Sequence, residues 1–78
     1  MSPAWTTDCP RWPGWYLTSV KDEIPHVMAR EVYKSHEHGM MVRYDPYRLW
    51  LAMSLEHWHA TQHPMWAGPY DAPPTEAP

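Results

Sequence analysis

The stretch DPYRLWLAMSLEHWHATQHP, residues 45–64, carries the clearest secondary-structure signal in the chain. Asp45 is a good helix N-cap residue, and the proline that follows it suits the first helical position. Pro64 marks the end of the pattern, because proline disfavours the α conformation in the residue before it. Between these limits one broad stripe recurs at helical spacing and predicts an amphipathic helix. The stripe consists of Tyr47, Trp50, Leu51, Ser54, Leu55 and Trp58.

A second helix is expected upstream of this stretch. Asp22 is a plausible N-cap, and Pro25 is tolerated in a first turn. Gly39 suits the position that follows a helix C-terminus. Apolar residues at helical spacing lie between these limits, namely Ile24, Val27, Met28 and Val32. The sequence therefore predicts a mainly α fold, in which residues 21–63 form a two-helix antiparallel hairpin.

Both flanks of this region are rich in proline. Residues 1–20 hold three prolines and three tryptophans. Because proline fixes φ and removes a donor, this zone is expected to be an extended arm, with a short strand at residues 15–20. Residues 64–78 are expected to form a Pro-rich, polyproline-like tail that is disordered on its own.

The apolar composition indicates an interface more than a self-sufficient core. Among 78 residues there are nine Leu, Ile and Val residues in total and no Phe, but six Trp, five Tyr and six Met. Cys9 is the only cysteine, so no disulfide within the chain can reinforce the fold. Tryptophan and tyrosine are favoured in interfaces. We therefore expect a partner to cover the rings, with these anchors: Trp5, Trp12, Trp15, Trp50, Trp58, Trp66, Tyr47 and Tyr70.

Charge and hydropathy argue against several classes of partner. The net charge is −3 with neutral histidines, and the basic residues are scattered. A nucleic-acid or anionic membrane partner is therefore not expected. No apolar run approaches the roughly 18 residues of a membrane span. The first residues lack the pattern of a secretory signal, so a cytoplasmic location is expected.

The histidines around residue 59 allow a metal-binding alternative. Glu56 and His59 are spaced i, i+3 on a helix, and His59 and His63 are spaced i, i+4. These three residues would be the ligands of zinc or another divalent metal that prefers histidine. In the simpler interpretation the histidines interact with helix C-terminal carbonyls, and the chain needs no cofactor.

The segment YRLWL, residues 47–51, is similar to the Tyr-x-x-Trp-Leu helix of nitrile hydratase beta-type subunits. The similarity covers five residues and implies a helix there. It assigns no activity, cofactor or site residue to this chain.

These features favour a small, non-catalytic accessory subunit that docks on and wraps a larger protein assembly, such as an enzyme complex. No residue is assigned a catalytic role, since Cys9 has no local acid–base partner. The first alternative is a histidine-based metal-binding protein. The second is a small phage or stress regulator that binds a host protein.

Overall fold

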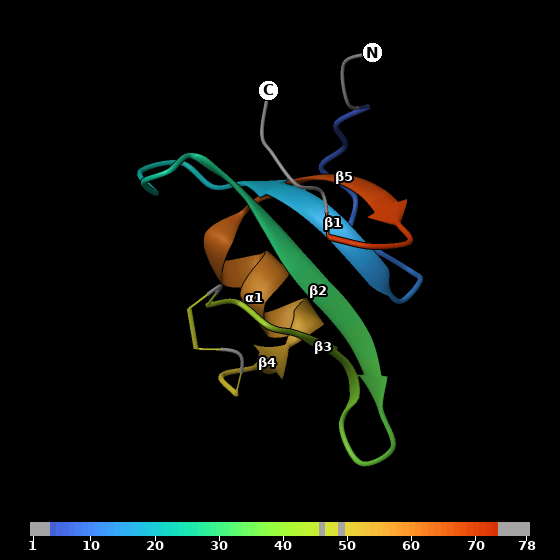
Figure 1. The fold of residues 1–78 in the computed structure, drawn as a ribbon. Helices are drawn as coiled ribbons and strands as arrows, with labels where there is room; N and C mark the ends of the chain where they lie inside the picture. The colour runs from blue at the N-terminus through green and yellow to red at the C-terminus, as the bar shows by residue number, and fades with distance from the viewer. Residues whose placement is uncertain (1–3, 46, 49, 74–78) are drawn as a thin grey trace.

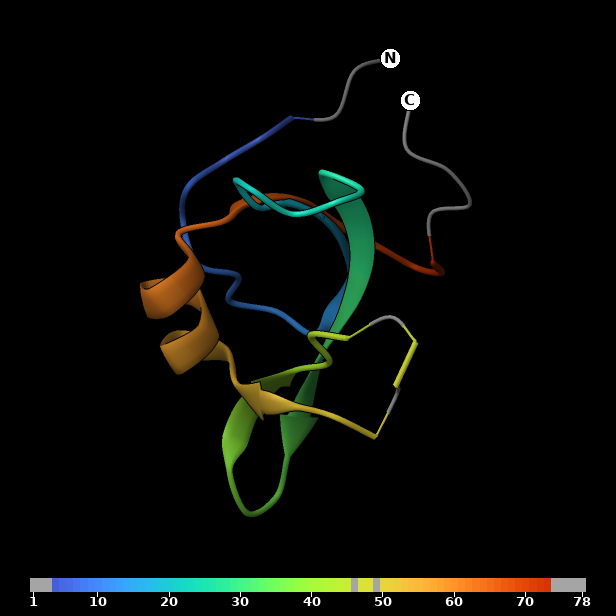
Figure 2. The same ribbon diagram turned by 90° about the vertical axis from the view of Figure 1, so that its left-hand side faces the viewer.

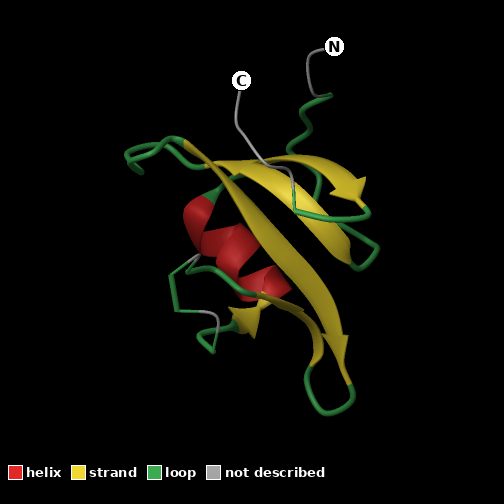
Figure 3. Ribbon diagram, viewed as in Figure 1, coloured by secondary structure: helices red, strands yellow, loops and turns green. Residues whose placement is uncertain are grey.

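The structure is a computed structural model, and it describes residues 4–45, 47–48 and 50–73. Five strands and one helix follow one another along these residues (Figure 1, Figure 3). They are β1 (Gly14–Ser19), β2 (Val27–Ser35), β3 (Gly39–Val42), β4 (Met53–Ser54), α1 (Leu55–Gln62) and β5 (Met65–Tyr70).

The strands form one antiparallel sheet in the order β4-β3-β2-β1-β5. The first four strands are a meander, and β5 returns to pair with β1. Figure 2 shows that the sheet is strongly curved and that α1 lies across its open side. The helix contacts β3 and β4. This arrangement encloses a core between the helix and the concave face of the sheet.

The predicted helical hairpin over residues 21–63 is wrong, because most of its first half is the β2–β3 hairpin. Arg30 and Val32 are both buried, whereas Glu31 between them is only partly covered. The true period is therefore two, as in a strand. Because Arg30 is a charged residue at an inward position, the alternation of apolar and polar residues expected of a strand cannot be recognised in the sequence. Gly39 does adopt a left-handed conformation, with φ of 73°, but it ends a hairpin turn and not a helix.

The second predicted helix is much shorter than expected. The Asp45 carboxylate accepts hydrogen bonds from the backbone N–H groups of Tyr47 and Arg48, at 2.9 and 3.2 Å, as an N-cap would. The chain then turns, with Leu51 N donating to the Arg48 carbonyl at 2.9 Å. Consequently α1 begins at Leu55, capped by Ser54. The helix that the YRLWL similarity implied is not formed by the described residues of that segment.

The other end of this helix was predicted correctly. The helix stops at Gln62, and His63 is a left-handed C-cap with φ of 49°. Its backbone N–H donates to the His59 carbonyl at 3.1 Å. Pro64 follows directly and is fully buried. Proline at this place thus excludes a further helical turn, as expected.

The two flanks are parts of the fold. The predicted strand at residues 15–20 is confirmed as β1, shifted by one residue. Thr6 pairs with Trp66 through two backbone hydrogen bonds of 2.8 and 2.9 Å. The prediction of a tail unstructured on its own is wrong for residues 65–70, which form β5 along β1. Residues 74–78 lie outside the described residues.

Aromatic rings form the centre of the core. The Trp66 ring packs edge-on against Tyr16 and Trp58, with ring centroids 5.7 and 5.4 Å apart. Trp66, Tyr16 and Trp58 are only 1, 3 and 4 % exposed. We name these three residues the ring cluster. Edge-to-face ring pairs add about 0.5–1.5 kcal/mol beyond their buried area. Three large rings therefore supply a core despite the few aliphatic residues, while the expectation that a partner covers the exposed rings stays a prediction.

A buried arginine joins the sheet to the helix. Arg30 is 3 % exposed, and its guanidinium lies 4.9 Å from the centroid of the Trp58 ring. It donates to the hydroxyl of Thr18 on β1, to the Glu23 carboxylate and to the Tyr44 carbonyl. A buried charge is tolerated only when it is paired and hydrogen-bonded in this way. This explains how an arginine can occupy a core position of β2.

Candidate partner-binding surface

Three large apolar side chains stand out into solvent on two loops. Ile24, in the β1–β2 connection, is 94 % exposed, while Tyr47 and Trp50, between β3 and β4, are 83 and 76 % exposed. Ile24 and Tyr47 line one shallow cavity of about 360 Å³. We name Ile24, Tyr47 and Trp50 the loop patch. Ile24 and Tyr47 share this cavity, and Trp50 protrudes from the same loop as Tyr47. Protruding apolar side chains on neighbouring loops are typical of surfaces that bind another protein.

The loop that carries Tyr47 and Trp50 is held by short-range hydrogen bonds. The Asp45 carboxylate binds two backbone N–H groups, and the turn from Arg48 to Leu51 closes with a 2.9 Å hydrogen bond. Local hydrogen bonds therefore order the described residues around the two rings, and such order lowers the entropy cost of binding.

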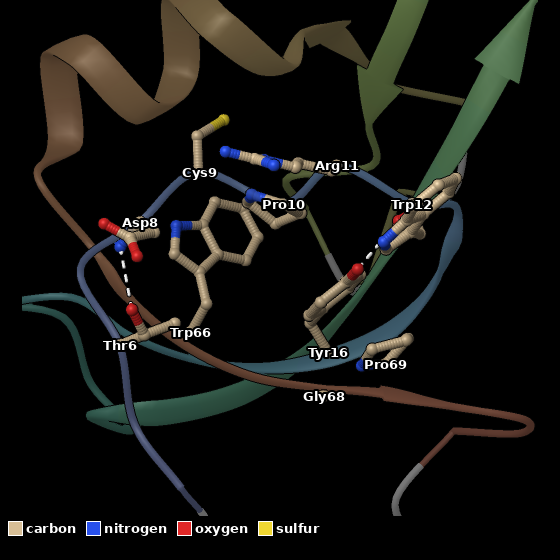
Figure 4. A pocket seen from close by; sticks show the side chains of 10 residues that line it. All are labelled: Thr6, Asp8, Cys9, Pro10, Arg11, Trp12, Tyr16, Trp66, Gly68 and Pro69. Carbon is tan, nitrogen blue, oxygen red and sulfur yellow. Dashed lines mark hydrogen bonds between the residues drawn. The ribbon is translucent and has the colours of Figure 1, made fainter.

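A second concave feature lies between the N-terminal arm and strands β1 and β5 (Figure 4). It has a volume of about 250 Å³. Five of its ten lining residues are rings or prolines, and we name it the proline-aromatic cleft. These five are Pro10, Trp12, Tyr16, Trp66 and Pro69, of which Tyr16 and Trp66 are almost fully buried.

The cleft wall is fixed by the Tyr16 hydroxyl, which donates to the Trp12 carbonyl at 2.7 Å. Burial raises the pKa of the Tyr16 hydroxyl above its ordinary value. Burial also raises the pKa of the Cys9 thiol, with a smaller contribution from the Glu56 carboxylate. Cys9 is therefore held as a thiol at neutral pH, which makes it a poor nucleophile.

The residues predicted as partner anchors fall into three groups. Trp58 and Trp66 belong to the ring cluster and are 4 and 1 % exposed, so neither can be a main anchor, although Trp66 contributes to the lining of the proline-aromatic cleft. Trp5 and Trp15 are half-buried. The exposed group consists of Trp12, Trp50, Tyr47 and Tyr70, of which Tyr70 is the least exposed at 37 %.

Ile24 was not predicted to lie on the surface, because it fits the first position of a helical stripe. The stripe does not form, since β2 begins at Val27. The useful signal was local. Ile24 lies among Asp22, Glu23 and Pro25, a composition typical of a turn and not of a helix interior.

The proposed metal ligands are not brought together as a site. Glu56 and His63 are exposed, whereas His59 lies against the core and its Nδ1 accepts a 3.0 Å hydrogen bond from Trp66 Nε1. Within residues 4–45, 47–48 and 50–73, no group of three or more His, Cys, Asp or Glu side chains could hold a metal ion. The described geometry therefore offers the histidine-based alternative no ligand set.

No protein-family model, curated protein or solved structure matches this chain. In the part of the chain that the structure describes, no helix is both long and apolar enough to cross a membrane. Any functional argument must therefore start from the surface described above.

Proposed function

We propose that this protein is a small, non-catalytic accessory subunit that docks on a larger protein assembly and stabilises it. The observation that carries the proposal is the loop patch, where Ile24, Tyr47 and Trp50 are 76 to 94 % exposed. The core of the described residues is built around the ring cluster and does not include Ile24, Tyr47 or Trp50. These three exposed side chains are therefore available to contact a partner protein.

The mode of docking differs from the one that the sequence suggested. Thr6 is hydrogen-bonded to Trp66, and residues 65–70 pair with β1 as β5. These parts of the two flanks are engaged in the fold of the chain itself. Contact is instead made by a folded domain through two adjacent loops. Aromatic side chains at the centre of such interfaces carry much of the binding energy.

A triple substitution of Ile24, Tyr47 and Trp50 to serine tests the proposal. Each truncation of an interface anchor costs about 1–2 kcal/mol, or about tenfold in affinity. We expect the tagged wild-type protein, purified from lysate of its native cells, to elute in a large, stoichiometric complex. The triple variant should elute as a free protein. The measurement is size-exclusion chromatography with mass spectrometry of the co-eluting proteins.

The matched control replaces Lys21 and Arg48 by serine. Both are exposed polar residues of the same two loops. This control should keep the complex, and both variants should melt at the wild-type temperature. Retention of the complex by the triple variant, or a wild-type protein that elutes without any partner, would refute the proposal.

A further inference from the structure

The proline-aromatic cleft has the chemistry of a site for an extended, proline-containing segment. Pro10, Tyr16 and Pro69 give it an apolar lining, and the Trp12 ring stands at its edge, 68 % exposed (Figure 4). Polyproline-type segments dock on aromatic-lined grooves, because their backbone is already extended and loses little entropy on binding. The cleft is also held in shape, since the Tyr16 hydroxyl fixes the Trp12 carbonyl at 2.7 Å.

Arg11 gives the cleft one positive group that can pair with a carboxylate of a bound segment. Arg11 lines the cleft and is exposed, and it forms no ion pair with any side chain in the described residues. Asp8 also lines the cleft. A segment that places one carboxylate toward Arg11 and apolar residues toward the rings would match both features.

The chain itself contains such a segment. Residues 71–78 read DAPPTEAP, with three prolines, two acidic side chains and no basic one. The segment starts directly after β5, whose Pro69 lines the cleft. Its first three residues are exposed and therefore do not occupy the cleft of their own molecule.

We propose that the proline-aromatic cleft binds residues 71–78 of a second copy of the chain. Two copies would each place this segment in the cleft of the other, which gives a symmetric pair of identical contacts. Each contact is small, and interfaces below about 1,200 Å² are weak. We therefore expect a dimer that forms in the micromolar to millimolar range. The cleft and the loop patch are separate sites, so the two proposals can fail independently.

Analytical ultracentrifugation of the purified full chain tests the dimer. The wild-type protein should change from monomer to dimer as its concentration rises. A chain that ends at Tyr70 and the full-length Trp12→Ala variant should both remain monomeric. Both should also keep the wild-type melting temperature, because Trp12 and residues 71–73 are exposed and lie outside the strands. The Trp50→Ala variant is the matched control, since it removes an exposed indole from the loop patch and should still dimerise.

Mixing the two monomeric proteins gives the sharpest result. The truncated chain keeps an intact cleft, and the Trp12→Ala chain keeps an intact segment, so the mixture should form a one-to-one heterodimer through one contact. A wild-type chain that stays monomeric at all concentrations overturns the proposal, whether its own segment or another protein fills the cleft. Dimerisation of the truncated chain overturns it as well.

Discussion

The ring cluster and the loop patch both contain tryptophan and tyrosine, but these side chains are buried in the ring cluster and exposed in the loop patch. Trp66 and Trp58 are 1 and 4 % exposed, while Trp50, from the same chain, is 76 % exposed. The difference comes from their neighbours. Trp66 lies on a paired strand facing the helix, whereas Trp50 lies on a loop outside the sheet. Composition alone therefore does not show which rings fold the protein and which rings remain available to a partner.

Replacement of Trp66 by alanine should have the largest effect on stability. It removes two edge-on ring contacts and the hydrogen bond to His59. Such truncations cost about 3–5 kcal/mol, most of the stability of a small domain. Trp50→Ala should change stability by less than about 0.5 kcal/mol. Urea denaturation measures both values.

If Trp66→Ala does not fold at all, Trp66→Phe keeps a ring and allows the measurement. Its stability should lie between those of the wild type and the alanine variant. Equal losses for Trp66→Phe and Trp50→Ala would contradict the distinction between the two regions.

Addition of a single methyl group near the ring cluster should have the next largest effect. Gly68 has φ of 144°, and a Cβ there would lie 2.8 Å from the Trp15 carbonyl oxygen and 2.9 Å from Tyr16 Cδ2. Gly68→Ala should therefore cost about 3 kcal/mol, because backbone strain and overpacking each contribute about 1–3 kcal/mol. Thermal melting followed by circular dichroism measures the loss.

Gly39 is the matched control for this substitution. It also has a positive φ, of 73°, but a Cβ there would meet nothing within 4 Å. Gly39→Ala should cost only about 1–2 kcal/mol, the penalty of the left-handed conformation alone. Similar losses of stability at both positions would show that the close contacts at Gly68 add nothing to the cost of placing alanine at a positive φ.

Sequence reasoning succeeded where a short-range rule decides the structure. The short strand near Trp15, the helix end before Pro64 and the side-chain cap at Asp45 all depend on neighbouring residues. It failed where long-range pairing decides. The strand β2 depends on Arg30, which can be buried only because Thr18, Glu23 and Tyr44 bind it from elsewhere in the chain.

The same limit applies to the candidate surface. Tyr47, Trp50 and Trp12 were predicted as exposed anchors together with Trp58 and Trp66, which are buried. The difference could not be predicted, because it depends on the return of β5 to β1. Nothing near Trp66 in the sequence indicates that its strand pairs with residues about fifty positions earlier.

Alkaline pH should weaken the region around the ring cluster by a smaller amount. Burial raises the pKa of Cys9 above its ordinary value of 9.0 and that of Tyr16 above 10.0. The folded chain therefore holds these protons more tightly than the unfolded chain. Unfolding releases them, so their contribution is complete below about pH 9 and is lost progressively as the pH rises further.

Urea denaturation of the reduced protein between pH 7 and pH 11 tests this dependence, with Cys9→Ala as the matched variant. The variant should lose less stability than the wild type on the first part of the rise, just above pH 9, because it has no thiol to ionise. Both proteins should continue to lose stability above pH 10, where Tyr16 contributes, and the variant should still lose less, because the Cys9 thiolate also raises the pKa of Tyr16. Parallel curves over the whole range would mean that the Cys9 thiol is not buried against the ring cluster, and that the N-terminal arm does not close this side of the core.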